Sequence, residues 1–174
     1  TYGYQITIMM AYMATQWQRA GGNPADMSIA IFHDDSEFGT DPLNAASDAA
    51  SRLRIGGVLA VEMRRGATDF TAELQQADDY GVTHIIIQST PEPAAIVARN
   101  VADFWGQGRV VVGCLNWCAN EQFISNAGNA AEGVLGTQPF APTSVRVTGQ
   151  ADATAALTAQ GLTLQTASLH FTEG

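Results

Sequence analysis

The sequence is poor in charged residues, and its basic residues are scarcer than its acidic ones. Only 14% of the 174 residues are charged, and 8 Lys and Arg stand against 17 Asp and Glu, which gives a formal net charge of −9. Arg64 and Arg65 form the only adjacent basic pair. Nucleic-acid-binding domains usually carry a basic stripe, and anionic membranes attract polybasic segments. We therefore expect neither nucleic acid nor an anionic membrane surface as a partner.

Long apolar runs, a leader sequence and a framework of cysteines are also missing. No run approaches the roughly 20 apolar residues that span a bilayer, and no charged segment is followed by an apolar stretch and a cleavage site. Two cysteines, Cys114 and Cys118, are too few for a disulfide-built fold. Because the chain runs from Thr1 to Gly174 without a methionine at its start, we expect a mature piece or a fragment of a longer protein.

The chain does contain a pattern of apolar strands that alternate with helices. Its hydrophobic residues make up 46% of the sequence, which is enough for a sizeable core. Residues 2–19 predict a helix, because Tyr4, Ile8 and Tyr12 recur at helical spacing. Further helices are expected at about 41–54, 70–80, 91–105, 119–127 and 148–160. Short apolar runs predict strands at 27–34, 58–63, 83–89, 109–114 and 133–140.

The starts of two of these helices are marked by capping residues. Thr40 or Asp41 is the expected N-cap of the helix at 41–54, which has Pro42 in its first turn. Thr68 or Asp69 is expected to cap the helix at 70–80.

The spacing of the strands indicates the fold class. Successive strands start roughly every 24–30 residues, the length of a βαβ unit, and uninterrupted apolar strands are typical of a sheet covered on both faces. Right-handed crossovers then predict an α/β fold, a doubly wound, mainly parallel five-stranded sheet with helices on both faces. We expect residues 1–140 to form this lobe. Residues 141–174 look different, with a linker at 141–144 followed by a helix of small residues.

In such a sheet a ligand binds at the carboxyl ends of the strands. Five loops qualify by position: 33–40, 64–68, 88–93, 113–119 and 138–142. The first, with Ser36 and Phe38, is the richest in functional groups. Its Asp34 and Asp35 resemble a Mg²⁺ or phosphoacceptor pair, but Gln88 and Ser89 stand where a third acid would be needed.

Catalytic motifs are missing from the expected places. No G-x-G-x-x-G or phosphate-binding loop follows the first strand, and no G-x-S-x-G nucleophile elbow occurs. The histidines His33, His84 and His170 are scattered, and His84 begins a strand at the end opposite the ligand loops. We therefore expect no enzyme activity, no cofactor and no metal.

The segment Cys114-Leu115-Asn116-Trp117-Cys118 is distinctive. Two thiols do not complete the four ligands of a zinc site. If the segment turns helically, the Cα atoms of the two cysteines lie roughly 6 Å apart, within disulfide range. A local disulfide and two reduced, partly buried thiols therefore stay open as alternatives. Trp117 either stacks on a ligand or covers the end of the sheet.

The order of these motifs resembles the second lobe of the type I periplasmic solute-binding proteins of ABC transporters, specifically the group that binds branched-chain amino acids (Leu, Ile and Val). The resemblance covers about residues 1–140. It is carried by HDDSEFG (33–39), MRRGATDFTAEL (63–74), HIIIQSTPEPAAIVARNVADF (84–104), VVVGC (110–114) and AGNAAEGVLGTQPFAP (127–142).

The resemblance implies a protein of two lobes that close on a small-molecule ligand like a hinged trap and deliver it to a transporter permease. It places the protein in the periplasm or outside the cell, with a lipid anchor as one option. It also implies that residues 141–174 cross back to a first lobe that is mostly missing here. We expect the apolar face of this tail to find a partner in a second copy of the chain. A sensory ectodomain with the same lobe stays open as an alternative, and a flavodoxin-like enzyme or phosphoacceptor is the third.

The ligand-binding residues of the family carry over only in part. Phe38 stands where the family has a tyrosine, and Ser89 and Thr90 fall in the loop after the third strand. The family's glutamate, which binds the ligand's ammonium group, corresponds to Leu115 or Asn116. Because a buried ammonium without a counter-charge is costly, an amide, a carboxylate without an amine or an aromatic compound fits the site better than an ordinary α-amino acid.

Overall fold

A five-stranded parallel sheet organises the computed structural model, which describes residues 1–139 and 148–163. The strand order is β2-β1-β3-β4-β5, and every neighbouring pair is parallel. This confirms the predicted doubly wound α/β class. The strands are β1 (Ser28–Asp34), β2 (Gly57–Met63), β3 (His84–Gln88), β4 (Val111–Cys114) and β5 (Leu135–Gly136). The fifth strand is shorter than the predicted 133–140, because only Leu135 and Gly136 pair with β4.

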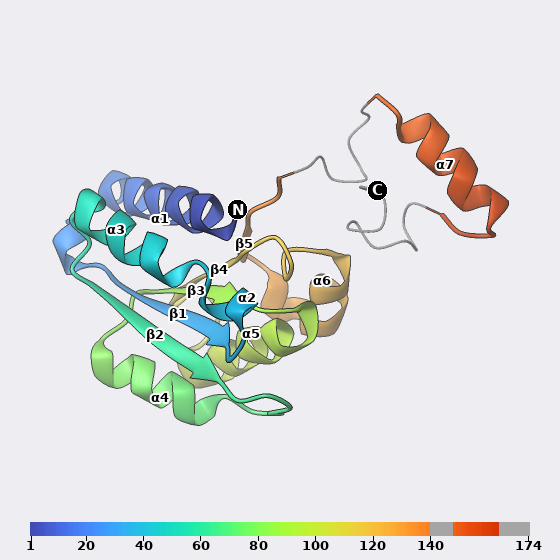
Figure 1. Cartoon of the computed structure of the whole chain (residues 1–174). Coiled ribbons are helices and arrows are strands. Elements are labelled where there is room, and N and C mark those ends of the chain that lie inside the picture. Colours follow the sequence, from blue (N-terminus) through green and yellow to red (C-terminus); the bar gives the residue numbers. More distant parts are fainter. Residues whose placement is uncertain (140–147, 164–174) are drawn as a thin grey trace.

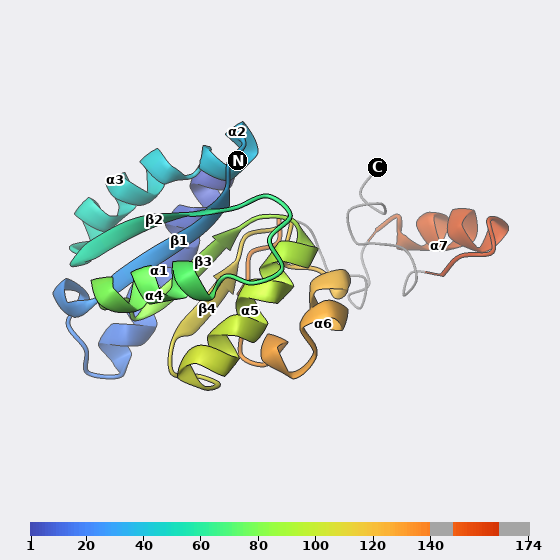
Figure 2. The same ribbon diagram turned by 90° about the horizontal axis from the view of Figure 1, so that it is seen from below.

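Helices cover both faces of the sheet (Figures 1 and 2). The helices are α1 (Tyr2–Arg19), α2 (Glu37–Thr40), α3 (Leu43–Leu53), α4 (Thr71–Tyr80), α5 (Pro91–Trp105), α6 (Glu121–Ala127) and α7 (Gln150–Ala159), with short 3₁₀ turns at η1 (Pro24–Asp26) and η2 (Gly128–Ala131). Alternation along β1 separates two core clusters: Ile29 and Ile31 pack toward α1 and α3, whereas Ala30 and Phe32 pack toward α4 and α5. In both views α7 lies apart from the sheet.

Helix α1 has the predicted bounds, but it does not bury the side chains that marked its periodicity. Tyr4, Ile8 and Tyr12 are 74%, 64% and 49% exposed. The helix instead turns its methionines to the sheet, and Met9 and Met13 are buried in the α1 side of the core. Gly113 of β4 makes this contact possible, because a Cβ there would lie 2.9 Å from the Met13 methyl carbon.

The helix predicted at about 41–54 is confirmed as α3, and a separate single turn, α2, precedes it. The single turn α2 begins after Ser36, whose side chain accepts a hydrogen bond from the Gly39 N–H, and α3 begins only at Leu43. The expected N-caps Thr40 and Asp41 are wrong, because the N-cap of α3 is Pro42. Thr40 is the last residue of α2, and Asp41 is its C-cap. For α4 the N-cap is Phe70, so the expected N-caps Thr68 and Asp69 are also wrong, although the Asp69 carboxylate accepts a hydrogen bond from the Thr71 N–H at 3.0 Å.

The expected crossover and tail at 141–174 fall largely outside the described residues, which exclude 140–147 and 164–174. Within the described part, α7 lies inside the predicted helix at 148–160. No helix in the two described ranges has the length and hydropathy needed to cross a membrane.

Candidate functional site

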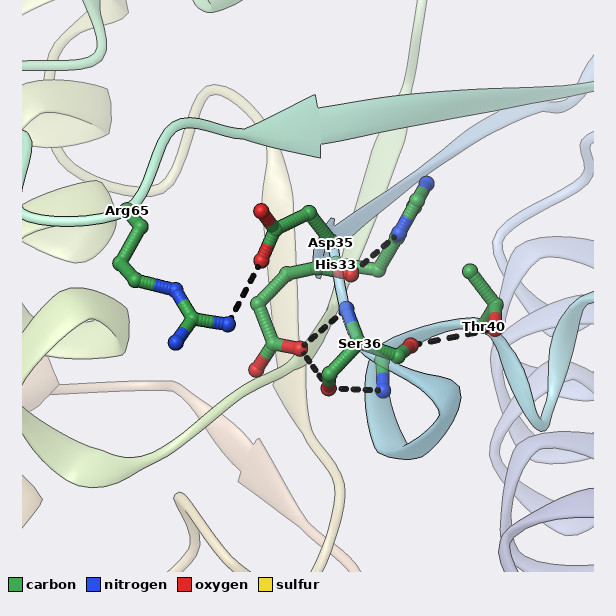
Figure 3. Close-up of polar contacts among 7 residues, drawn as sticks. His33, Asp35, Ser36, Thr40 and Arg65 are labelled. Atoms are coloured by element: carbon green, nitrogen blue, oxygen red, sulfur yellow. Dashed lines mark hydrogen bonds and ion pairs between the residues drawn. The ribbon is translucent and has the colours of Figure 1, made fainter.

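The loop after β1 is held in shape by a chain of hydrogen bonds at the carboxyl edge of the sheet (Figure 3). An Asp34 carboxylate oxygen accepts from the backbone N–H of Ser36 at 3.2 Å and from the Ser36 hydroxyl. The Ser36 oxygen in turn accepts from Gly39. Gly39 has no room for a side chain, because a Cβ would lie 2.1 Å from the Asp34 carbonyl oxygen. These contacts fix the position of Phe38 between Ser36 and Gly39.

Both aspartates of this loop already have partners. Asp34 is used in the turn, and Asp35 forms an exposed ion pair with Arg65 at 3.1 Å (Figure 3). Within residues 1–139 and 148–163, no three His, Cys, Asp or Glu side chains come together as a metal-binding group.

The end of β3 contributes a buried amide that the sequence did not mark as a site residue. Gln88 is fully buried, and its Nε2 donates to the Phe38 carbonyl oxygen at 2.8 Å, which ties β3 to the loop after β1. The Gln88 Oε1 is buried without a hydrogen-bond partner. Gln88 follows three buried isoleucines at the edge where ligands bind, and this position was the signal that could have identified it.

A cavity of about 470 Å³ lies beside these loops, on the α4 and α5 side. Three of the predicted site residues line it, namely Ser36, Ser89 and Thr90, together with the predicted loop at 64–68. The N-terminus of α5 borders the cavity but offers few donors, because Pro91 and Pro93 lack N–H groups. The loops after β1, β2 and β3 therefore line a cavity at the carboxyl edge that has both polar and apolar side chains in its wall.

The two predicted aromatic site residues, Phe38 and Trp117, pack with a third ring on the α1 side of the same edge. Phe38 packs edge-to-face on Tyr2, with ring centroids 5.2 Å apart, and on Trp117, at 6.3 Å. The Trp117 indole N–H donates to the Tyr2 hydroxyl at 2.6 Å. We call Tyr2, Phe38 and Trp117 the aromatic cluster. Its rings come from α1, the loop after β1 and the turn after β4, and Tyr2 was not predicted.

A network of amides and a hydroxyl connects α1 to the ends of β4 and β5. The Gln5 Oε1 accepts from the Asn116 N–H at 2.9 Å and from the Thr137 hydroxyl at 2.8 Å. The Asn116 Oδ1 is buried without a partner. Leu115, the alternative to Asn116, has its side chain fully buried in the core on the α1 side, and its role as a contact residue stays a prediction.

The two cysteines are free thiols in the structure, and the disulfide alternative is not formed. Both lie in the core on the α4 and α5 side. The Cys118 thiol is directed at backbone carbonyls, 3.3 Å from that of Ile87 and 3.4 Å from that of Leu115. Burial, and secondarily the neighbouring Cys118 thiol, raises the pKa of Cys114. The pair is therefore in the reduced, buried alternative.

The two histidines of the described part lie at opposite ends of the sheet. His84 begins β3 at the amino end of the sheet, as predicted, and is buried against Trp17. Burial lowers its pKa to about 4, so the imidazole is neutral at physiological pH. His33 is buried in β1, with Nδ1 2.9 Å from the Asp34 carbonyl oxygen. His170 lies outside the described residues.

Comparison with solved structures shows the same fold in longer proteins. A branched-chain amino acid ABC transporter protein from Thermus thermophilus with bound valine superposes with a TM-score of 0.80 at 23% identity, over 93% of this chain and 40% of that chain. A substrate binding protein of an ABC transporter from Aeropyrum pernix gives 0.78 at 17% identity, over 97% and 44%. A solute binding protein of an ABC transporter from R. palustris in complex with 4-hydroxybenzoate gives 0.74 at 22%, over 90% and 42%.

This chain thus spans less than half the length of these neighbours. No curated protein matches it. The protein family described as "Periplasmic binding protein" matches residues 1–170, nearly the whole chain. The chain therefore belongs to the periplasmic binding protein family.

Proposed function

We propose that this chain is the second lobe of an extracytoplasmic solute-binding protein that serves an ABC importer. It binds a small organic ligand at the carboxyl edge of its sheet and releases it unchanged. The observation that carries this proposal is the cavity of about 470 Å³ at that edge, lined by Ser36, Ser89 and Thr90. Binding sites for small molecules typically have several hundred Å³ and a few well-placed polar groups.

The proposed site needs a second wall. The carboxyl edge of the lobe is open, with Thr90 and Trp117 exposed there. The solved neighbours are more than twice as long as this chain. In our proposal the remaining chain forms the first lobe, residues 141–174 lead into it, and hinge closure buries the ligand between the two lobes. The permease of the importer is then the protein partner, in the periplasm or at the outer face of the membrane, with or without a lipid anchor.

A binding role suits the chemistry of the edge better than catalysis. The Asp34 carboxylate is used in its turn and Asp35 is paired with Arg65. The Cys114 thiol is buried with a raised pKa, which keeps it protonated and unreactive. No side chain among these is placed as an activated nucleophile beside a base.

The solved neighbours bind different ligands, so the fold alone does not indicate which ligand to expect. Valine occupies the Thermus thermophilus protein and 4-hydroxybenzoate the R. palustris protein. Membership of the branched-chain amino acid group is therefore proposed here as ancestry and architecture, and not as ligand identity.

A thermal-shift screen of the whole protein tests the proposal. Amino acids, amides, aromatic acids and fatty acids are each added at millimolar concentration. At least one class should raise the melting temperature in a dose-dependent way, because a ligand that binds only the folded state stabilises it by mass action. The double variant Ser89→Val, Thr90→Val should weaken this response. Failure of every class, with a well-folded protein, contradicts the proposed function.

A further inference from the structure

Strand β2 is the outermost strand on one side of the sheet, with α3 and α4 on either face beside it (Figure 1). Within residues 1–139 and 148–163, no strand pairs with its free edge. We propose that β2 pairs antiparallel with β2 of a second copy of this chain, across a twofold axis between the two Ala60 residues. The two sheets then continue into one another. This surface is separate from the tail at 141–174, and such a dimer would form with or without a ligand at the carboxyl edge.

The backbone of β2 presents a regular set of hydrogen-bonding groups to this edge. The Gly57 N–H donates to the Met27 carbonyl oxygen at 3.2 Å, so the backbone groups of Gly57 face β1. Because the hydrogen-bonding groups of successive residues face alternate sides of a parallel strand, those of Val58, Ala60 and Glu62 point away from β1. Ala60 and Glu62 are exposed, so the middle of this edge is open to solvent.

The edge lacks the features that usually prevent strands from pairing. Native proteins protect exposed edges with lysine, proline, bulges or very short strands. Strand β2 has seven residues in unbroken register with β1, contains no proline, and has Glu62 as its only charged residue. The sequence contains no lysine at all. The opposite edge strand, β5, has only two residues. A long, regular and nearly uncharged edge is expected to pair with a further strand.

The outward-facing residues are arranged symmetrically about Ala60, which makes the edge complementary to itself. In an antiparallel pair centred there, Ala60 lies opposite Ala60 of the second copy, and Val58 of each copy lies opposite Glu62 of the other. Each opposed pair can exchange two backbone hydrogen bonds, because all of these groups already point outward. A twofold interface must use the same patch on both subunits. A strand from a different protein needs no such symmetry, so the symmetry favours a second copy.

The side chains of β2 suit this register as well. The formal net charge of −9 opposes association in general, so two copies need a register without opposed carboxylates. The two Glu62 residues lie four positions apart along the paired strands, about 13 Å, which exceeds the screening length of roughly 8 Å at physiological ionic strength. On the α4 face, Leu59 lies opposite Val61 of the second copy. Leu59 is only half-buried in the lobe, so pairing would bury more of its apolar surface.

The oligomeric state of the whole protein tests the proposal. Sedimentation equilibrium over the micromolar range should show a reversible monomer–dimer equilibrium. Ala60→Pro should weaken the dimer at least about tenfold, because proline removes both hydrogen bonds of the central pair. The fold should tolerate this proline, since the Ala60 N–H points away from β1, and circular dichroism checks that it does. A monomer at every concentration overturns the proposal, as does a dimer of unchanged strength in folded Ala60→Pro.

Charged variants at the axis test the register, and they keep the proposal falsifiable if Ala60→Pro does not fold. In Ala60→Lys or Ala60→Glu alone, like charges face each other and should weaken the dimer at least about threefold. An equimolar mixture of the two should associate more tightly than either alone, because opposite charges then meet. The absence of either effect overturns the proposal.

Ala20→Lys is the matched control for the added charge. Ala20 is exposed after the end of α1 and lies outside β2. A lysine at either position reduces the net negative charge, which by itself favours association. We therefore expect the dimer of Ala20→Lys to be as strong as that of the wild type or slightly stronger. If Ala20→Lys weakens the dimer as much as Ala60→Lys does, the axis does not lie at Ala60 and the proposal is overturned.

Discussion

The indole N–H of Trp117 donates a hydrogen bond to the hydroxyl of Tyr2 at 2.6 Å, across 115 positions of the sequence. This contact joins the first turn of α1 to the turn after β4 and places both rings around Phe38. The aromatic cluster is thus a tertiary feature, assembled from three separate parts of the chain.

Removing only the Tyr2 hydroxyl should loosen Trp117 without removing a ring. In Tyr2→Phe we expect the free energy of unfolding to fall by about 0.5–1.5 kcal/mol, the usual worth of one hydrogen bond. Urea unfolding measures this change, and Tyr4→Phe is the matched control because Tyr4 is exposed on the same helix. Equal losses in both variants would show that the Tyr2 hydroxyl has no specific role.

Adding a methyl group at Gly39 should disrupt the loop after β1. A Cβ there would lie 2.1 Å from the Asp34 carbonyl oxygen, which is backbone and cannot step aside. We expect Gly39→Ala to lose about 1–3 kcal/mol of stability, as overpacking does elsewhere, and to weaken ligand binding because Phe38 moves. Gly66→Ala is a useful comparison, since its Cβ would meet nothing within 4 Å, although its positive φ adds some strain. A fully stable Gly39→Ala protein would contradict the loop geometry.

The two faces of α1 should differ sharply in their contribution to stability. Met13 is buried against the sheet, so Met13→Ala should cost about 2–5 kcal/mol. Ile8 is 64% exposed, so Ile8→Ala should change stability by less than about 0.5 kcal/mol. Chemical denaturation of both variants checks this. The opposite order would mean that α1 packs through the face carrying Tyr4 and Tyr12.

His84 should make the free energy of unfolding decrease as the pH becomes acidic. Its folded pKa of about 4 lies below the ordinary value of 6.5, because burial disfavours the charged imidazole. Between these values the unfolded chain binds a proton at His84 that the folded chain does not. The contribution of neutral His84 is therefore full above about pH 6.5 and declines as the pH falls toward 4, by up to roughly 3 kcal/mol.

Urea unfolding at pH 7.5 and pH 5.0 measures this dependence, and His84→Gln serves as the reference because glutamine does not titrate. The stability lost between the two pH values should be larger in the wild type than in His84→Gln. Equal losses in the two proteins would show that His84 titrates alike in the folded and unfolded states.

The sheet was predictable from sequence because its signals are local. The apolar run His84–Gln88 and the Thr90-Pro91 helix start lie where the structure has β3 and α5. The face of α1 was not predictable in the same way. Its tyrosines and methionines are both apolar at helical spacing, and only the close approach of Met13 to Gly113 selects the methionines.

The position of the candidate site was predictable from the sequence, but the long-range contacts between its residues were not. The rule that ligands meet the carboxyl ends of parallel strands pointed to the loops that carry Ser36, Ser89 and Trp117. Tyr2 and Gln5 were missed because their partners lie more than 100 residues away in the sequence. Leu115 and Asn116 stood as alternatives because a one-residue uncertainty at the end of a strand decides whether a side chain faces the core, as Leu115 does, or the edge.

The central claim is that the carboxyl edge of this sheet binds a small molecule, and mapping the site by NMR tests it most directly. The whole protein, labelled with ¹⁵N, is titrated with a compound that stabilises it in the thermal-shift screen. We predict chemical-shift changes at Ser36, Phe38, Ser89 and Asn116 and at the Trp117 indole, with none at Thr83 and Gln107 at the amino end of the sheet. Changes confined to the amino end, or none in this lobe, would contradict the claim.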